Sequence, residues 1–417
     1  MRRPATILLA GTVFLIPMLP PLCAVATSQS TVSNTQTQSG AVSSTQALNV
    51  VDVSGANTVT TTATGNAVSG AVESGALDVE STQSLSGAIN AGAQLNVTTN
   101  AGPQTVMTTA ATGNSGDVGS YEGGALTGAV NQSITAAGTV TAGSQFNAYS
   151  AQAGDVSTTT QAIGNTHGIG VSDASAAMTV NQTNSANITA NGDALLQYTP
   201  GTGSFTATAV SNNVTSAGTG AASQTLTVSQ TADGMTVTEL DANAGNAQTI
   251  SGAATSTANN LSVTNENNGL TVVANQSNTG YAQAQAQVSG YQFGTGQAAA
   301  YGVDNSVLAG NYGSSLSLDN TQSNTATGLE VRAAFTGGAS GETNYDASAS
   351  ATAMGNAATG YACSACNANI AVTNSQSNSA TIGATTEVDI AGANRSVTAT
   401  ATAAGNSATF YVSKPTQ

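Results

Sequence analysis

Charged side chains are scarce in this sequence, and tryptophan is missing altogether. Only 6% of the 417 residues are Asp, Glu, Lys or Arg, and there is a single histidine, His167, whereas an ordinary soluble domain has about 25% charged residues. So small a set of acids and bases argues against an enzyme: there is no paired nucleophile and base, no G-x-S-x-G segment and no calcium-binding loop. We therefore predict no catalytic residues, no metal site and no cofactor, and we expect His167, within NTHGIG, to lie in a turn.

Positive charge is rarer still, and part of it lies at the N-terminus. Arg2 and Arg3 precede the apolar run ILLAGTVFLIPMLPPL and an A-x-A site that ends at Ala26. This order is typical of a secretory signal peptide. We predict cleavage after Ala26, which divides the chain into a signal peptide at 1–26 and a single repeat domain at 27–417.

The remaining chain would be strongly acidic. It holds three basic residues, Arg332, Arg395 and Lys414, against 20 acidic ones. That balance excludes nucleic acid as a partner but is compatible with a neutral or cationic polysaccharide. No later apolar run reaches the roughly 18 residues of a membrane-spanning helix, so we expect no transmembrane segment after the signal peptide.

Cysteine is equally rare. Cys363 and Cys366, in CSAC, follow the signal peptide, and a C-x-x-C pair can be a redox motif or half of a zinc site. Neither a βαβ context nor a second pair of ligands is visible, so we favour a local disulfide that closes a loop. A lipid-modified Cys23 is disfavoured, because the Pro-Pro-Leu that precedes it is a poor lipoprotein signal.

What the sequence has in abundance is repetition. One series of asparagines, each after a Thr/Ala-rich run, recurs every 45 to 51 residues: Asn66, Asn114, Asn165, Asn213, Asn260, Asn305, Asn356 and Asn406. A second series, of glutamines in phrases such as NQSNTG, recurs every 46 to 54 residues: Gln36, Gln83, Gln132, Gln182, Gln230, Gln276, Gln322 and Gln376. The two series stay in phase, which predicts about eight repeats of about 48 residues.

The pattern within each repeat predicts strands. In SVTATATA at 396–403, valine and alanine alternate with threonine, and a period of two is the signature of a β-strand. Gly-Asn pairs tolerate left-handed backbone angles, so we expect a turn at each one. The prediction is an all-β, elongated β-solenoid in which each repeat consists of two strand–turn–strand halves, with stacked Asn and Gln side chains bonded along the ladder.

Two structural functions other than attachment fit such a chain. Regular T-x-T arrays on flat solenoids bind ice, but the threonines at 60–64 and 398–402 are interrupted at 158–164 and 348–352. Curlin-type amyloid subunits share the Q-x-x-N spacing and the composition, although their repeats are about half as long. A curlin-like fibre subunit or a surface adhesin is therefore the main alternative, and an ice-binding solenoid is a minor one.

The QSNSA and TATATAxGNSATG phrases, the eight degenerate copies, the signal peptide and the late CSAC together resemble the holdfast-attachment protein D family of stalked alphaproteobacteria. The resemblance covers the whole mature chain. It implies a non-enzymatic protein exported to the outer membrane at the cell pole. There it would act with a curlin-like partner and an outer-membrane lipoprotein to anchor an adhesive polysaccharide, the holdfast. The resemblance brings no catalytic, cofactor or metal-binding residues.

The ends of the repeat domain lack obvious caps. The first glutamine phrase, at 31–40, begins soon after the predicted cleavage site, and the last asparagine phrase occupies 403–412. Solenoids usually need polar capping units to stay monomeric. We therefore expect unpaired strand edges at both ends, through which the protein joins another copy or a curlin-like partner.

Overall fold

The computed structural model describes residues 29–339, 343–363 and 368–413, and every regular element in this part of the chain is a β-strand. The prediction of an all-β chain built from stacked parallel strands is confirmed. The predicted signal peptide at 1–26, together with Cys366 and Lys414, lies outside the described residues.

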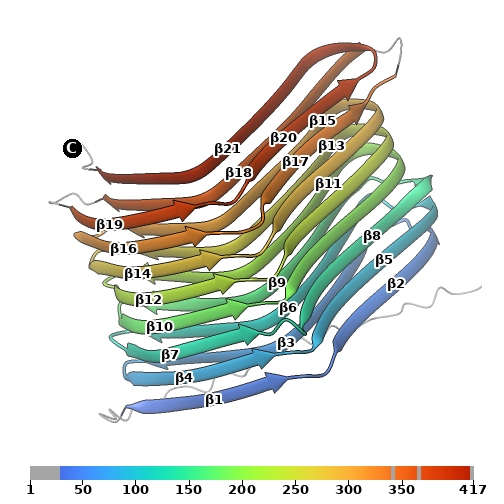
Figure 1. Cartoon of the computed structure of the whole chain (residues 1–417). Helices are drawn as coiled ribbons and strands as arrows, with labels where there is room; N and C mark the ends of the chain where they lie inside the picture. The colour runs from blue at the N-terminus through green and yellow to red at the C-terminus, as the bar shows by residue number, and fades with distance from the viewer. Residues whose placement is uncertain (1–28, 340–342, 364–367, 414–417) are drawn as a thin grey trace, which may run out of the picture.

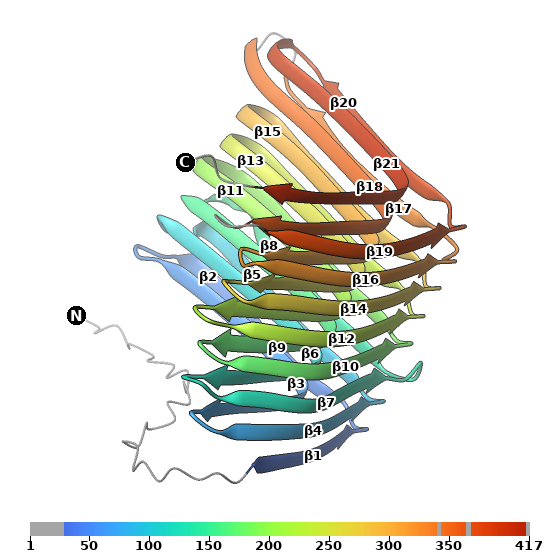
Figure 2. The ribbon, with the colours of Figure 1, turned by 90° about the vertical axis from the view of Figure 1, so that its left-hand side faces the viewer.

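The chain runs out along one layer and returns along another. The first layer begins with a stack of short parallel strands (Figures 1 and 2). These are β1 (Ser30–Gln38), β4 (Ala76–Leu85), β7 (Ala125–Ile134), β10 (Ser175–Asn184), β12 (Ser223–Ala232), β14 (Gly269–Asn278), β16 (Ser315–Asn324) and β19 (Asn369–Asn378). We call this the first stack.

After a short break the outgoing layer bends into a second stack. It contains β2 (Val42–Asp52), β5 (Ala88–Asn100), β8 (Thr139–Gln152), β17 (Leu329–Gly337) and β20 (Ile382–Ile390). The return stack contains β3 (Asn57–Glu73), β6 (Gln104–Tyr121), β9 (Asp155–Ser172), β18 (Thr343–Cys363) and β21 (Ala393–Ser413). Three long strands pass through both without a break: β11 (Asn187–Thr219), β13 (Thr236–Asn265) and β15 (Ala282–Asn311).

The return strands follow both outgoing stacks, so the cross-section has two arms that meet at a bend (Figure 1). The two halves predicted for each repeat therefore differ in form. The outgoing half is two strands divided at the bend, as in β1 and β2, whereas the returning half is one long strand, as in β3. Because the two halves face each other, similar phrases in them lie on opposite layers.

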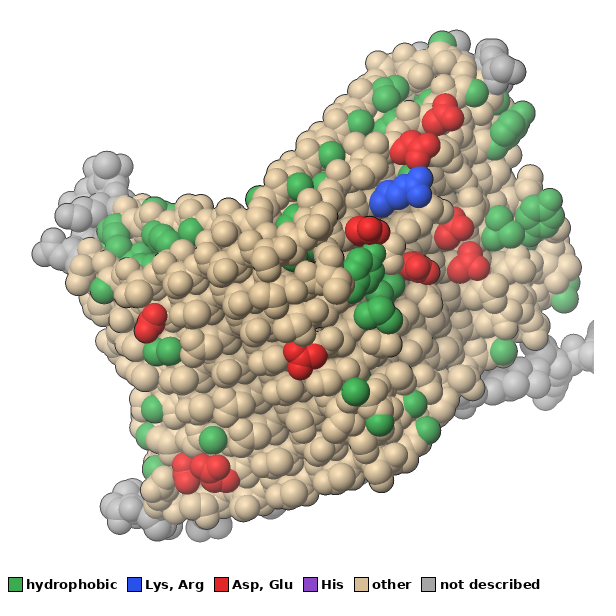
Figure 3. All heavy atoms as spheres, viewed as in Figure 1, with side chains coloured by type: hydrophobic (Ala, Val, Ile, Leu, Met, Phe, Trp, Pro, Cys, Tyr) green, Lys and Arg blue, Asp and Glu red, His purple; other side chains and the backbone are tan. Residues whose placement is uncertain are grey.

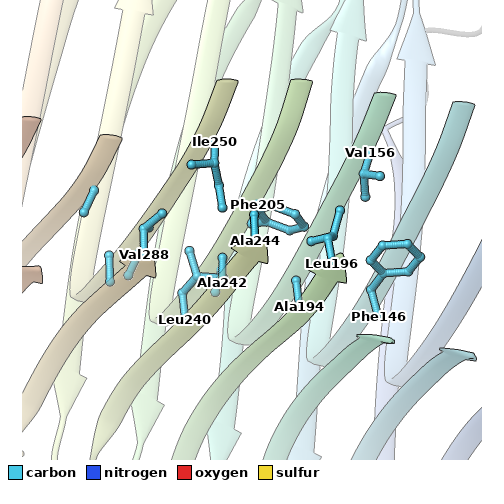
Figure 4. Packing of buried hydrophobic residues seen from close by; sticks show 14 of the residues in the cluster. Phe146, Val156, Ala194, Leu196, Phe205, Leu240, Ala242, Ala244, Ile250 and Val288 are labelled. Carbon is cyan, nitrogen blue, oxygen red and sulfur yellow. The ribbon is translucent and has the colours of Figure 1, made fainter. Parts of the chain in front are cut away.

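Alternation places the small residues inside. In β3, Val59, Thr61 and Ala63 are buried, while the threonines between them are exposed. The arm under the second stack has the larger core, in which Phe146 of β8, Leu196 and Phe205 of β11 and their neighbours meet between the layers (Figure 4). Separate clusters fill the other arm and the bend. Alanine and valine dominate all of them, so the layers lie close together.

The expected turn at each Gly-Asn pair is wrong. Gly65 and Asn66 lie in the middle of β3, and neither has a positive φ. Pairing with the next strand skips one residue at this point, from Thr64 to Asn66. The glycine is needed for space instead, because a Cβ on Gly65 would lie 2.6 Å from the carbonyl oxygen of Gly113 above it. The pair marks the bend of the return strand, and not a reversal of the chain.

Replacing Gly113 tests this packing. A Cβ there would lie 2.6 Å from the backbone oxygen of Gly164, which cannot move without disturbing the stack. We expect Gly113→Ala to lower the free energy of unfolding by about 1–3 kcal/mol. Gly143→Ala is the matched control, since a Cβ there meets nothing within 4 Å, and it should leave stability unchanged or raise it by about 0.5 kcal/mol. Urea unfolding followed by circular dichroism measures both; equal losses would contradict the packing argument.

Candidate functional site

The predicted glutamines form one continuous internal ladder. All eight occupy the same position of successive first-stack strands, from Gln36 in β1 to Gln376 in β19. Each Nε2 donates to the Oε1 of the preceding glutamine at 2.7–2.9 Å. Every one of these bonds therefore points in the same direction, toward β1.

The asparagines form a second ladder, with two corrections to the prediction. Its members are Asn66, Asn114, Asn165, Asn212, Asn259, Asn305, Asn356 and Asn406, joined at 2.7–2.9 Å. Asn213 and Asn260 are not in this ladder. They bond to each other at 2.8 Å one residue further along. The doublets SNNV and ANNL concealed the register, because either asparagine of each pair fits the spacing.

The asparagine ladder runs in the opposite direction to the glutamine ladder. Each Nδ2 donates to the Oδ1 of the following asparagine, toward β21. In every ladder amide except Asn406, one side-chain N–H donates to a backbone oxygen of the facing layer, as in Gln182 to Asn213 O at 2.9 Å and Asn165 to Thr183 O at 3.0 Å. Buried amides left without partners are costly, so these bonds lock the two layers together and fix their register.

Two buried ionisable groups lie inside the solenoid. His167 is an inward residue of β9, and not a turn residue as expected, with no hydrogen bond to either ring nitrogen among the described residues. Burial lowers the pKa of His167 to about 4. Asp304 occupies the same position in its coil as Gly65 does in the first coil. Burial raises the pKa of Asp304 to about 7, although the 2.7 Å hydrogen bond that Asn324 donates to it favours the charged form. Both side chains are fully enclosed, so neither can reach a substrate.

The cysteine prediction is not tested. Cys363 ends β18 and is partly buried, whereas Cys366 lies outside the described residues. Among the residues that are described, no group of three or more His, Cys, Asp or Glu side chains is placed to hold a metal ion.

An open groove crosses the outer face of the second stack, and the sequence analysis missed it. It has a volume of about 750 Å³ and spans strands from β2 to β15. Its floor includes Gly92 and Gly143, and its wall is an aligned series at the same position of successive strands: Ala47, Gln94, Gln145, Asp193, Asp241 and Gln287. The period of 46 to 51 residues in this series was the signal that could have revealed it.

The groove is polar and acidic. Gln94 donates to Gln145 at 3.0 Å, and Gln145 bonds Asp193. Burial, followed by the charge of Asp241, raises the pKa of Asp193, while the bond from Gln145 opposes the rise. Figure 3 shows several carboxylates gathered on this arm around a basic side chain, while the carboxylates of the neighbouring arm are scattered and have no basic side chain beside them. Amides and carboxylates in rows can donate and accept hydrogen bonds along an extended polar ligand.

The groove continues along the same face toward β20. A neighbouring hollow shares Gln285 with it and is lined by Tyr281, Glu330 and Arg332. The hydroxyl of Tyr281 donates to Glu330 at 2.9 Å. Burial, followed by this hydrogen bond and the charge of Glu330, raises the pKa of Tyr281 to about 12. Arg332 pairs with Glu387 of β20 at 2.8 Å. The tyrosine adds an aromatic surface beside the polar rows.

The outer face of the return stack does not carry the regular array of threonines that ice binding requires. The column that begins with Thr60, Thr108, Thr159 and Thr206 continues with Ala253 and Ala299. The array of threonines is thus interrupted in the middle of the face, where a flat ice-binding surface would need it to be regular.

The described strands form a parallel β-solenoid with an open polar groove on one outer face. No helix in the described residues is both long and apolar enough to cross a membrane. A family model for holdfast attachment protein D matches residues 51–328, more than half of the chain, and the chain belongs to this family. Comparisons with curated proteins and with solved structures found no match. The family is one of attachment proteins at the cell surface and is not known for catalysis.

His167 should make the fold sensitive to acid. Its pKa is about 4 when folded and about 6.5 when unfolded, so the stability it contributes is present above pH 6.5 and is lost as the pH falls toward 4. Over that window the parent should lose about 3 kcal/mol more than His167→Leu. Urea unfolding at pH 7, 5.5 and 4 tests this, and parallel pH curves for the two proteins would show that the ring is not enclosed.

Asp304 should have the opposite effect. Its folded pKa of about 7 exceeds the unfolded value of about 3.9, so stability is fully present below pH 4 and is lost as the pH rises through 7. Asp304→Asn has a similar shape and no charge to desolvate. At pH 8 it should be more stable than the parent, by up to about 4 kcal/mol, with little difference at pH 4. Thermal unfolding at both pH values tests this; a variant less stable at pH 8 would refute it.

Proposed function

We propose that this protein is an exported, non-enzymatic anchor that holds an adhesive polysaccharide, the holdfast, on the outer surface of the cell at its pole. In this proposal residues 1–26 are a signal peptide and residues 27–417 form one solenoid domain. The membership of the holdfast attachment protein D family supports the attachment role. The family resemblance adds a curlin-like protein and an outer-membrane lipoprotein as partners, and a multimeric β-rich assembly as the working form.

The observation that supports direct binding of polysaccharide is the groove on the second stack. It is open to solvent, its floor includes Gly143, where a Cβ would meet nothing within 4 Å, and its wall repeats amide and carboxylate groups on neighbouring strands. Such groups bond the hydroxyls of a sugar chain without needing opposite charge. The repeated rows suit a repeating ligand better than a single small molecule.

A fibre subunit that does not contact polysaccharide is the second candidate. It is favoured by the two amide ladders, which have the same side-chain stacking as cross-β fibres. The two candidates differ in whether the groove matters for retention of the adhesive.

Groove variants test the proposal. Gly143→Leu should fill the groove without disturbing the stack, since nothing lies within 4 Å of a Cβ there, and Gln145→Ala removes a wall amide. We expect each to weaken binding of the polysaccharide purified from the same cells at least tenfold, and cells carrying Gly143→Leu to shed their adhesive.

The matched control is Asn181→Ala. Like Gln145, Asn181 is an exposed amide that bonds an amide of the neighbouring strand, Asn131 at 2.9 Å, but it lies on the first stack, away from the groove. Its binding and adhesive retention should equal those of the parent. If groove variants bind and retain the adhesive normally while export is intact, the groove is not the polysaccharide site.

A further inference from the structure

Both ends of the described solenoid leave strands with one unpaired edge. At one end these are β1, β2 and β3, and at the other β19, β20 and β21. The inward apolar residues here are only partly buried, among them Leu48 and Val50 at the first end and Val388 and Ile390 at the second. Their equivalents one coil inward are enclosed: Leu95 is 0% exposed.

The two ladders leave complementary groups at these ends. Gln36 uses one N–H for Ala67 O, and its other N–H has no acceptor in the described chain, because the ladder supplies partners only to Oε1. At the far end, Oε1 of Gln376 has no donor, since its own N–H groups bond Gln322 and Ser407. One end therefore presents a glutamine donor and the other a glutamine acceptor.

In the asparagine ladder the free donor lies at the β21 end and the free acceptor at the β3 end, the reverse of the glutamine ladder. Within the solenoid each Nδ2 bonds two groups of the next coil, as Asn356 bonds Asn406 Oδ1 and Ser377 O. Both N–H groups of Asn406 therefore lack these partners in the described chain, while Oδ1 of Asn66 lacks a donor. A coil equivalent to the first, placed on β19–β21, would supply Asn66 Oδ1 and Thr37 O as acceptors to Asn406. Its Gln36 Nε2 would donate to Gln376 Oε1.

The side chains match in this register. With Gln36 following Gln376, and Asn66 following Asn406, Val388 lies over Leu48 and Ile390 over Val50. Phe410, the largest inward residue of β21, falls over Gly70, where a Cβ would meet nothing within 4 Å. The acidic residues of β20 meet no acidic residue, since Glu387 falls over Ala47 and Asp389 over Asn49.

We propose that copies of this chain stack head to tail, with the β19–β21 end of one copy pairing in register with the β1–β3 end of the next, so that both amide ladders continue across the junction. This deepens the multimeric assembly of the proposed function by naming the partner, the orientation and the bonds. Such a contact joins two different surfaces of the protein. When successive copies do not rotate so as to close a ring, a contact of this kind produces an open filament. Two identical ends could not continue the ladders, because Gln36 needs the acceptor that Gln376 carries and Asn66 needs the donor that Asn406 carries.

Engineered cysteines test orientation and register together. In the exported protein with Cys363→Ser and Cys366→Ser, Ser43→Cys and Gly383→Cys would lie on neighbouring strands at the junction, about 4.8 Å apart, within disulfide range. On a non-reducing denaturing gel the double variant should give covalent dimers, trimers and longer species, whereas each single variant should give no covalent oligomers. Covalent dimers from Ser43→Cys alone would show head-to-head contact, and no oligomers from the double variant would overturn the stacking.

Two controls sharpen the test. Asn49→Cys combined with Gly383→Cys shifts the pair by six residues, about 20 Å, and should not cross-link. Asn406→Asp replaces the ladder donor with an acceptor and should raise the concentration needed for assembly at least tenfold. Asn394→Asp adds the same charge at an exposed amide of the same end and should change the concentration needed for assembly less than twofold. Equal effects of the two substitutions would refute the ladder junction, and polysaccharide binding is measured separately, so either proposal can fail alone.

Discussion

The stacking of buried amides in register is the constraint on which the rest of the structure depends. A glutamine in the first stack bonds its neighbours above and below and the facing layer as well, and the asparagine ladder does the same at the bend. If the register of any coil shifted by one residue, several buried amides would lose their hydrogen-bond partners. Each lost partner would lower the free energy of unfolding by about 1–3 kcal/mol. The longest interval, 54 residues from Gln322 to Gln376, still preserves pairing on both sides. The ladders therefore tolerate changes in the connections but not in the strands.

The narrow interior explains the unusual composition. Layers held together by side-chain amides leave room for alanine, valine and glycine, and the bend brings backbones so close that Gly65, Gly113 and Gly164 have no space for a Cβ. There is no room to hydrate a charge inside, so charges lie on the outer face of the solenoid. His167 and Asp304 are enclosed exceptions, and burial shifts their pKa values in opposite directions. The inward positions are therefore almost free of charged side chains.

Sequence reasoning was most successful where a chemical signal repeated without ambiguity. The alternation of Val, Ala and Thr revealed the strands, and the regular spacing of the glutamine phrases identified the ladder residue in each repeat. It failed where local preference competes with stacking. Gly-Asn favours turns in isolation, but the pair at Gly65 is held in a strand by neighbours about 48 residues away. The doublets at Asn212 and Asn259 were ambiguous by one residue, which only the pairing resolves. The groove was missed because its wall mixes Gln with Asp and therefore does not read as one series.

The opposed directions of the two ladders give the solenoid a polarity that its similar repeats would otherwise hide. The β1–β3 end presents a glutamine donor and an asparagine acceptor, and the β19–β21 end presents the reverse, so only unlike ends can continue both ladders. The same register would carry the outer columns across a junction, with Glu387 continuing the series that begins at Ala47. A filament built this way would extend the polar face of every copy along one line. A long polysaccharide could then contact many weak sites at once, and linked weak contacts hold far more firmly than any single one.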